Sequence, residues 1–244
     1  MRTEPNFVIE HSNEVASDVY ETHVTDEPRV AKHRRVSHAI GPGKLRENSF
    51  APAGRPWHHG RVLNGVLTDY QAAGETEVAD LERMRGLAHT AADPWSRSQL
   101  PLHLTGSALV LHPASRRVLL RWHVKHDRWL QVGGHGDPGE SDPLQIALRE
   151  AREETGLSDL VPWPDEKLQH AVVCYVRPSG TEPEHEHGDL RYFLATDRPD
   201  EIAQENEQSP LRWLTIGEAR ALVGDNNLSE TLDRVELLFD QHSR

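Results

Sequence analysis

The chain has 244 residues, of which 36% are hydrophobic and 27% charged, and its formal net charge is −12. So acidic a protein is a poor match for nucleic acids and anionic membrane surfaces, because both recruit many Lys and Arg side chains. No stretch approaches the ~20 apolar residues that span a bilayer, and the N-terminus lacks the apolar core of a secretory signal. With one cysteine, Cys174, neither an intramolecular disulfide nor a cysteine-based zinc site is possible. These properties predict a cytoplasmic protein.

The first part of the chain separates into two stretches. Residues 1–56 have little hydrophobic periodicity and contain Gly/Pro clusters, which predicts an irregular or disordered extension. Residues 57–102 are expected to form a helical N-terminal segment. Apolar residues recur at helical spacing over 62–70 and again over 78–87, and Gly74 between them can end the first helix. We expect this helical pair to cap the domain that follows.

A single domain is expected over residues 103–244, where the pattern changes to strands. Apolar runs bounded by turn residues predict strands, the first two of which form a hairpin. The expected strands cover residues 104–111, 118–122, 129–132, 169–177, 189–196 and 211–214, and the expected helices cover 142–155, 216–223 and 228–241. This order predicts an α/β fold in which helices cover both faces of a mixed sheet, an α/β/α sandwich. Cys174 is expected to be a buried core thiol in its strand.

The helix expected over 142–155 is specified by residues at its own ends. Asp142 is a good N-cap, Pro143 suits the first helical position, and Gly156 is a natural stop. Three carboxylates share one face of this helix because of their i, i+3 and i+4 spacing: Glu150, Glu153 and Glu154. Their mutual repulsion is relieved by a hard divalent cation, which prefers carboxylate oxygens. The helix taken alone is better explained as an ordinary solvated, charged face.

A glycine-rich loop precedes the helix, and loop and helix together resemble the box of the Nudix (MutT-like) hydrolase superfamily. That pattern is Gly-x5-Glu-x7-Arg-Glu-U-x-Glu-Glu-x-Gly-U, where U is aliphatic. Gly134 to Glu140 matches its first part, and Arg149 to Leu157 matches its second part. Eight residues separate Glu140 from Arg149 where the pattern has seven. The extra residue is placed at 141–143, where it leaves the spacing of the helix carboxylates unchanged but alters the path from Glu140.

The resemblance implies a Nudix-type fold and Mg²⁺-dependent hydrolysis, with Mn²⁺ as a possible substitute. The substrate would be a small molecule containing a nucleoside diphosphate, and the enzyme an acid-anhydride pyrophosphatase. The implied metal ligands are the carboxylates of the helix and the carbonyl of the loop glycine: Glu150, Glu153, Glu154 and Gly133. Glu150 could instead be the general base. Arg149 would orient the helix carboxylates, Glu140 would support them, and Gly133, Gly134 and His135 would form the phosphate loop.

Several residues near or outside the box have two interpretations. Glu186, with Glu184 behind it, is a candidate extra metal ligand or base, although the run around it could equally be a polar loop. His135 could touch phosphate or simply bind nearby backbone. His185 and His187, two positions apart, hint at zinc, but the pair has no third ligand in the sequence.

Two other functions are possible for a chain with this box. A Nudix-fold nucleotide-binding or regulatory module that does not hydrolyse is disfavoured, because all three box carboxylates are present. A diphosphate isomerase would need a placed reactive residue, and Cys174 is expected to be buried. The expected partner is the diphosphate substrate rather than a membrane or nucleic acid, and a homo-oligomer is compatible with the sequence. The identity of the substrate stays open.

Overall fold

The computed structural model describes residues 59–242 except 225–226, so the extension expected over residues 1–56 lies outside the described part. Two helices come first, α1 (His59–Asp69) and α2 (Glu75–Thr90). Gly74 directly precedes α2 with φ at 88°, a left-handed conformation that glycine adopts without strain. Among the described residues, no helix is both long and apolar enough to cross a membrane.

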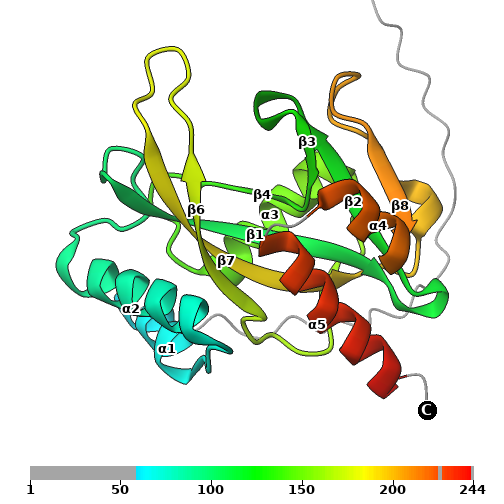
Figure 1. Cartoon of the computed structure of the whole chain (residues 1–244), viewed down its shortest axis with the longest axis horizontal. Helices are drawn as coiled ribbons and strands as arrows, with labels where there is room; N and C mark the ends of the chain where they lie inside the picture. Colours follow the sequence, from blue (N-terminus) through cyan, green and yellow to red (C-terminus); the bar gives the residue numbers. More distant parts are fainter. Residues whose placement is uncertain (1–58, 225–226, 243–244) are drawn as a thin grey trace, which may run out of the picture. The chain divides into compact units, whose positions relative to one another are not determined.

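Eight strands of the described chain form one mixed sheet (Figure 1). They are β1 (Leu102–His112), β2 (Arg117–His123), β3 (Arg128–Leu130), β4 (Val132–Gly134), β5 (Val161–Pro162), β6 (His170–Val176), β7 (His185–Ala195) and β8 (Leu211–Thr215). The main order is β3-β2-β1-β7-β5, while β4 also pairs with β1, β6 with β7, and β8 with β2. β1 and β7 are parallel and every other pair is antiparallel. The predicted β1–β2 hairpin is confirmed, with Val110 opposite Leu119.

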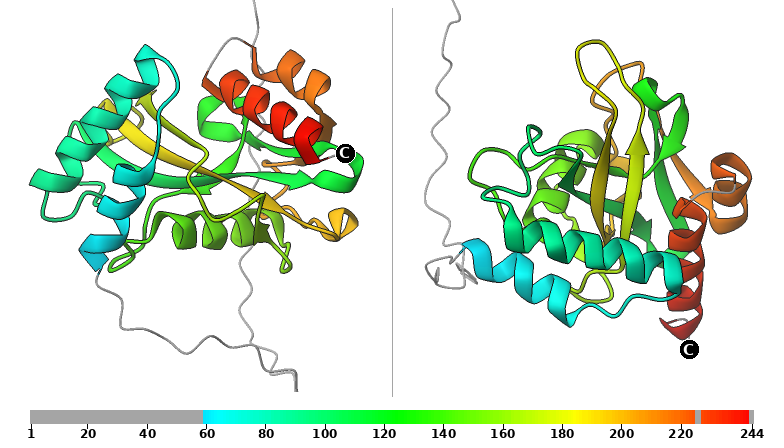
Figure 2. Two further views of the ribbon diagram at one scale, coloured as in Figure 1. Left: turned by 90° about the horizontal axis from the view of Figure 1, so that it is seen from below. Right: turned by 60° about the vertical axis from the view of Figure 1, so that its left-hand side comes forward.

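Helices cover both faces of this sheet (Figure 2), as predicted for an α/β/α sandwich. α3 (Pro143–Thr155) lies on one face, where Ile146 joins Leu104 of β1 and Met84 of α2 in one hydrophobic cluster. α4 (Ile216–Val223) and α5 (Asn227–His242) lie on the other, where Leu232 and Leu109 belong to a second cluster. Alternating residues of β1 therefore pack into two separate hydrophobic cores, as expected for a strand covered by helices on both faces.

A buried carboxylate anchors the N-terminal helix pair to the domain. Glu77 of α2 is only 3% exposed. It accepts hydrogen bonds from the Tyr70 hydroxyl and the Ala171 amide of β6, and it forms an ion pair of 2.7 Å with Arg234 of α5. The partners of Glu77 thus come from the α1–α2 loop, β6 and α5, so this carboxylate ties the helix pair to the domain.

Candidate functional site

The loop and helix predicted to carry chemistry are positioned by local interactions. The Asp142 carboxylate accepts hydrogen bonds from the amides of Leu144 and Gln145, at 3.0 and 3.4 Å, and Gly156 ends α3 with φ at 71°. The helix ends predicted from these caps are confirmed. Asp142 and Gly156 thus fix where α3 begins and ends, and the face that carries Glu150 and Glu154 is turned toward β4.

Two glycines allow β4 to pack closely against both its sheet neighbour β1 and the helix α3. A Cβ on Gly133, whose φ is 146°, would lie 2.3 Å from the Cβ of Ser107 on β1. A Cβ on Gly134 would lie 2.7 Å from the carboxyl carbon of Glu150 on α3. Any side chain would therefore push the strand away from one neighbour or the other. Glycine at both positions brings the backbone close to the helix carboxylates.

The three helix glutamates differ in their surroundings. Glu154 accepts a 3.0 Å hydrogen bond from the Gly133 amide and forms a 3.0 Å ion pair with Arg121. Burial raises the pKa of Glu154 to about 7, although the Arg121 guanidinium acts in the opposite direction. Burial also raises the pKa of Glu150, and the negative charge of Glu153 adds to this rise. Glu153 has a side chain that is 59% exposed.

One guanidinium links the loop to these glutamates. Arg149 donates to Glu140 from Nε at 3.0 Å and from Nη2 at 2.8 Å, and to the His135 carbonyl at 2.8 Å. Its Nη1 donates to Glu150 at 2.9 Å and to Glu153 at 3.2 Å. The hydrogen bonds from Arg149 hold the pKa of Glu140 below its usual range. Glu140 therefore reaches Arg149 despite the extra residue between them.

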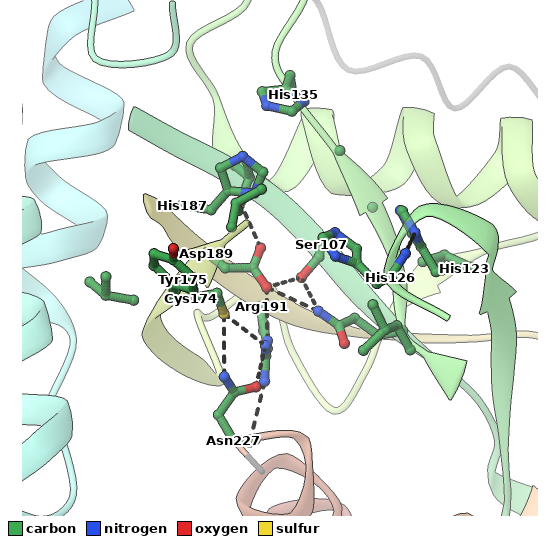
Figure 3. A pocket seen from close by; sticks show the side chains of 18 of the residues that line it. Ser107, His123, His126, His135, Cys174, Tyr175, His187, Asp189, Arg191 and Asn227 are labelled. Atoms are coloured by element: carbon green, nitrogen blue, oxygen red, sulfur yellow. Dashed lines mark hydrogen bonds and ion pairs between the residues drawn. The ribbon is translucent and has the colours of Figure 1, made fainter. Parts of the chain in front are cut away.

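Gly133 and Gly134 also line a cavity of about 420 Å³. Figure 3 shows side chains that line this cavity. Its polar wall is built around Asp189 of β7, which accepts hydrogen bonds from Thr105, Ser107 and Gln131 at 2.9, 2.9 and 3.0 Å. Arg191 completes the set with a 2.8 Å bond to the same carboxylate. Gly133 and Gly134 line this cavity and also contact Glu154 and Glu150, so a single short strand separates the cavity from the box glutamates.

The residues near or outside the box that had two interpretations lie in different places. His135 lines the cavity, and its Nε2 lies 3.0 Å from the Nε2 of His103. Burial lowers the pKa of His135 to about 4 and that of His187 to about 2. Glu186 forms an ion pair with Arg83 of α2 instead of pointing with its neighbours His185 and His187, since strand residues alternate. Glu184 accepts a hydrogen bond from Tyr175.

Comparison with known proteins supplies the family. Residues 102–235 match the model of the NUDIX domain. The chain belongs to the Nudix family. It is 34% identical over 108 residues to the asymmetrical bis(5'-nucleosyl)-tetraphosphatase of Mus musculus, covering 43% of this chain and 67% of the relative. Among solved structures, a NUDIX-family hydrolase from Clostridium perfringens is 25% identical with a TM-score of 0.43, covering 56% of this chain and 97% of the other. An Ap4A hydrolase from C. elegans is 17% identical with a TM-score of 0.41, covering 56% and 98%.

The family confirms the resemblance drawn from the box and the expectation of a hydrolase. Carboxylate oxygens and the Gly133 carbonyl are the donors that hard cations such as Mg²⁺ and Mn²⁺ prefer. The raised pKa of Glu154 fits this interpretation, since a buried negative charge is stabilised by a nearby cation. The donors present in this Nudix protein are therefore suited to the metal that the box implies.

Several features of this Nudix protein were missed in the sequence. Cys174 lies in its predicted strand but belongs to the cavity wall, where it is half-buried and contacts Asn227, so the expectation of a core thiol is wrong. Burial raises the pKa of its thiol. The buried pair of Asp189 and Arg191 also lines the cavity, and its signal was two opposite charges in the mostly apolar strand predicted over residues 189–196.

Proposed function

We propose that this Nudix protein hydrolyses a diphosphate linkage in a small molecule that contains a nucleoside diphosphate. The observation that carries the proposal is the position of Glu150 and Glu154 against the two glycines of β4. Both carboxyls are buried enough for their pKa values to be raised, and each lies beside backbone that could receive a phosphate. A carboxylate pair with this environment is best explained by a cation that shares it.

Mg²⁺, or Mn²⁺ in its place, would be held by Glu150, Glu153, Glu154 and the Gly133 carbonyl. When bound, such an ion would supply positive charge to the diphosphate oxygens and would activate a water for attack on phosphorus. Glu150 acts either as a ligand or as the base that removes a proton from the water. The open strand at Gly133 and Gly134 lets phosphate oxygens approach the backbone closely.

The residues around these ligands have positioning roles. Arg149 holds Glu150 and Glu153 through one guanidinium nitrogen, and Glu140 fixes the other side of the same guanidinium. This arrangement limits the conformations of the two helix carboxylates before a metal arrives. His135, which follows the glycines, can contact a phosphate from the rim of the cavity.

The cavity beyond β4 is proposed to receive the nucleoside part of the substrate. Its volume of about 420 Å³ lies in the range of roughly 300–1,000 Å³ found for small-molecule sites. Tyr175, which is 60% exposed on its wall, offers an aromatic face for a base. Similarity to the mouse tetraphosphatase makes bis(5'-nucleosyl) tetraphosphates the first substrates to assay.

A substrate panel tests this function directly. Bis(5'-nucleosyl) tetraphosphates, ADP-ribose, nucleotide sugars and nucleoside triphosphates are incubated with the full chain, with Mg²⁺ or with a chelator, and products are separated by chromatography. We expect at least one compound to be cleaved between two phosphates only when the metal is present. Tight binding of a compound without cleavage of any would instead favour the non-hydrolysing module.

A further inference from the structure

Four histidines from three separate parts of the sequence gather in the fold, and two of them, His135 and His187, line the cavity. Three lie on strands, His103 on β1 and His185 and His187 on β7, while His135 directly follows β4. The ring of His103 lies 5.1 Å from that of His135, 5.1 Å from that of His185 and 4.8 Å from that of His187, measured between centroids. The sequence showed only the pair on β7, which lacked a third partner.

The sheet brings these residues together. β1 and β7 run parallel with His103 directly opposite His187, so both side chains leave the same face. On the other side of β1, Gly134 of β4 pairs with Gly106, and His135 comes next along the chain. His185 is two residues before His187 and therefore shares its face. The cluster thus combines three neighbouring strands, as a binding site does.

The outer ring nitrogens of two histidines are held by backbone carbonyls. The Nδ1 of His103 lies 3.3 Å from the Gln99 carbonyl, and the Nδ1 of His185 lies 2.9 Å from the Pro183 carbonyl. A carbonyl only accepts hydrogen bonds, so each Nδ1 is the donor in these contacts, which leaves each Nε2 as the nitrogen to face a metal. Metal-binding histidines are commonly oriented by a hydrogen bond of this kind.

We propose that His103, His135 and His187 bind a divalent transition-metal ion such as Zn²⁺. One ring nitrogen of each lies within 4.8 Å of those of the other two. Zn–N bonds of about 2.0–2.1 Å in tetrahedral geometry place ligand nitrogens roughly 3.4 Å apart. Small rotations of the side chains are enough to reach that spacing. A set of imidazoles selects zinc and similar ions over Mg²⁺, which prefers oxygen.

His185 lies beside this set of three and orients His187. Its Nε2 lies 3.1 Å from the Nε2 of His187, and the residue is buried. Without a metal, the same contacts form two hydrogen bonds, one between His103 and His135 and one between His185 and His187. A metal site predicts tight zinc binding, whereas a purely hydrogen-bonded cluster predicts none, so the measured zinc affinity decides between the two.

The test measures metal binding by the full chain after it has been stripped with a chelator. Calorimetry with Zn²⁺ and absorption spectroscopy with Co²⁺ give the affinity and the geometry of the site. We expect one tight equivalent of Zn²⁺ and visible bands of tetrahedral Co²⁺. Loss of an outer-shell partner alone costs about 10–100-fold in affinity, so His135→Gln and His187→Gln should each weaken Zn²⁺ binding by more than ~100-fold.

A matched control is the His126→Gln variant. His126 lies on the same cavity, beside His123 rather than within the cluster, with its ring centroid 4.4 Å from that of His123. This variant should keep the zinc affinity and Co²⁺ spectrum of the unmodified chain. Wild-type affinity in both His135→Gln and His187→Gln, or an equal loss in His126→Gln, would overturn the proposal. Circular dichroism without metal shows that each variant folds.

The zinc site does not depend on the proposed hydrolytic function, and one variant separates them. Glu153→Gln removes a box carboxylate but no histidine, so its Zn²⁺ affinity should equal that of the wild type even where Mg²⁺-dependent turnover is lost. A Glu153→Gln protein with weakened Zn²⁺ binding would place that ion among the glutamates and refute the histidine site.

Discussion

Removal of the Arg149 guanidinium should destabilise the protein in a metal-dependent way. Hydrogen bonds to charged groups contribute about 1.5–3 kcal/mol when well formed. The Arg149 and Glu140 side chains are 22% and 29% exposed, so their contact is partly protected from water. The Glu153 side chain is 59% exposed, so its contact with Arg149 is screened by solvent and contributes little. We therefore expect Arg149→Gln to lower the free energy of unfolding by roughly 2–3 kcal/mol. For a domain of this size, that corresponds to a fall in Tm of about 4–12 °C.

Thermal unfolding with and without Mg²⁺ measures this effect. Without the Arg149 guanidinium, the glutamates of α3 repel one another more strongly. Mg²⁺ should therefore stabilise Arg149→Gln more than the wild type, so the difference in Tm between the two proteins should become smaller. Arg149→Lys keeps the charge without the planar fork and should be intermediate. Arg152→Gln, an exposed position on the same helix, is the control and should change little. An Arg149→Gln protein as stable as the wild type, or a difference that widens with Mg²⁺, would refute this reasoning.

Three further variants test the surroundings of the site. Gly133→Ala should cost roughly 2–4 kcal/mol in urea unfolding, because φ is 146° and the new Cβ meets Ser107 at 2.3 Å. Asp189→Asn leaves Arg191 buried without its carboxylate and should cost about 3–5 kcal/mol, whereas replacing both residues by apolar ones should cost less than the sum of the two single changes. Burial lowers the pKa of His170 to about 3, so near pH 6.5 this ring takes up a proton in the unfolded chain but not in the folded one. The free energy of unfolding should therefore fall as the pH drops below about 6.5, by up to ~1.4 kcal/mol per pH unit. His170→Gln should remove that part of the slope when unfolding is compared at pH 7 and pH 5, and an unchanged slope would contradict it.

Elements that are specified by their own residues were predicted well. The N-cap at Asp142 and the stop at Gly156 define α3 without reference to the rest of the chain. Predictions were less good where tertiary contacts decide. The expected strand over 129–132 is divided into β3 and β4, and the two-residue β5 has no pattern of its own. β7 begins at His185 rather than near residue 189, because the polar run there pairs with β1 and β6.

The same distinction applies to the candidate site. The spacing of the helix glutamates follows from the geometry of a single helix, so the sequence was sufficient to group them. The histidine cluster depends on the register between β1 and β7, where His103 lies opposite His187. Pairing between strands that are far apart in the chain leaves no local signal. The cavity wall was hidden for the same reason, since Ser107 and Asp189 meet only in the folded sheet.

Turnover of the Glu153→Gln variant tests the central claim most directly, once the panel has identified a cleaved substrate. The control is Glu82→Gln, because Glu82 is also a helical glutamate and its side chain is 65% exposed, against 59% for Glu153. We expect Glu153→Gln to lose Mg²⁺-dependent turnover by orders of magnitude while its Tm stays close to that of the wild type. Glu82→Gln should keep both the Tm and the activity of the wild type. Full turnover by a folded Glu153→Gln protein would contradict a metal site built on these helix carboxylates.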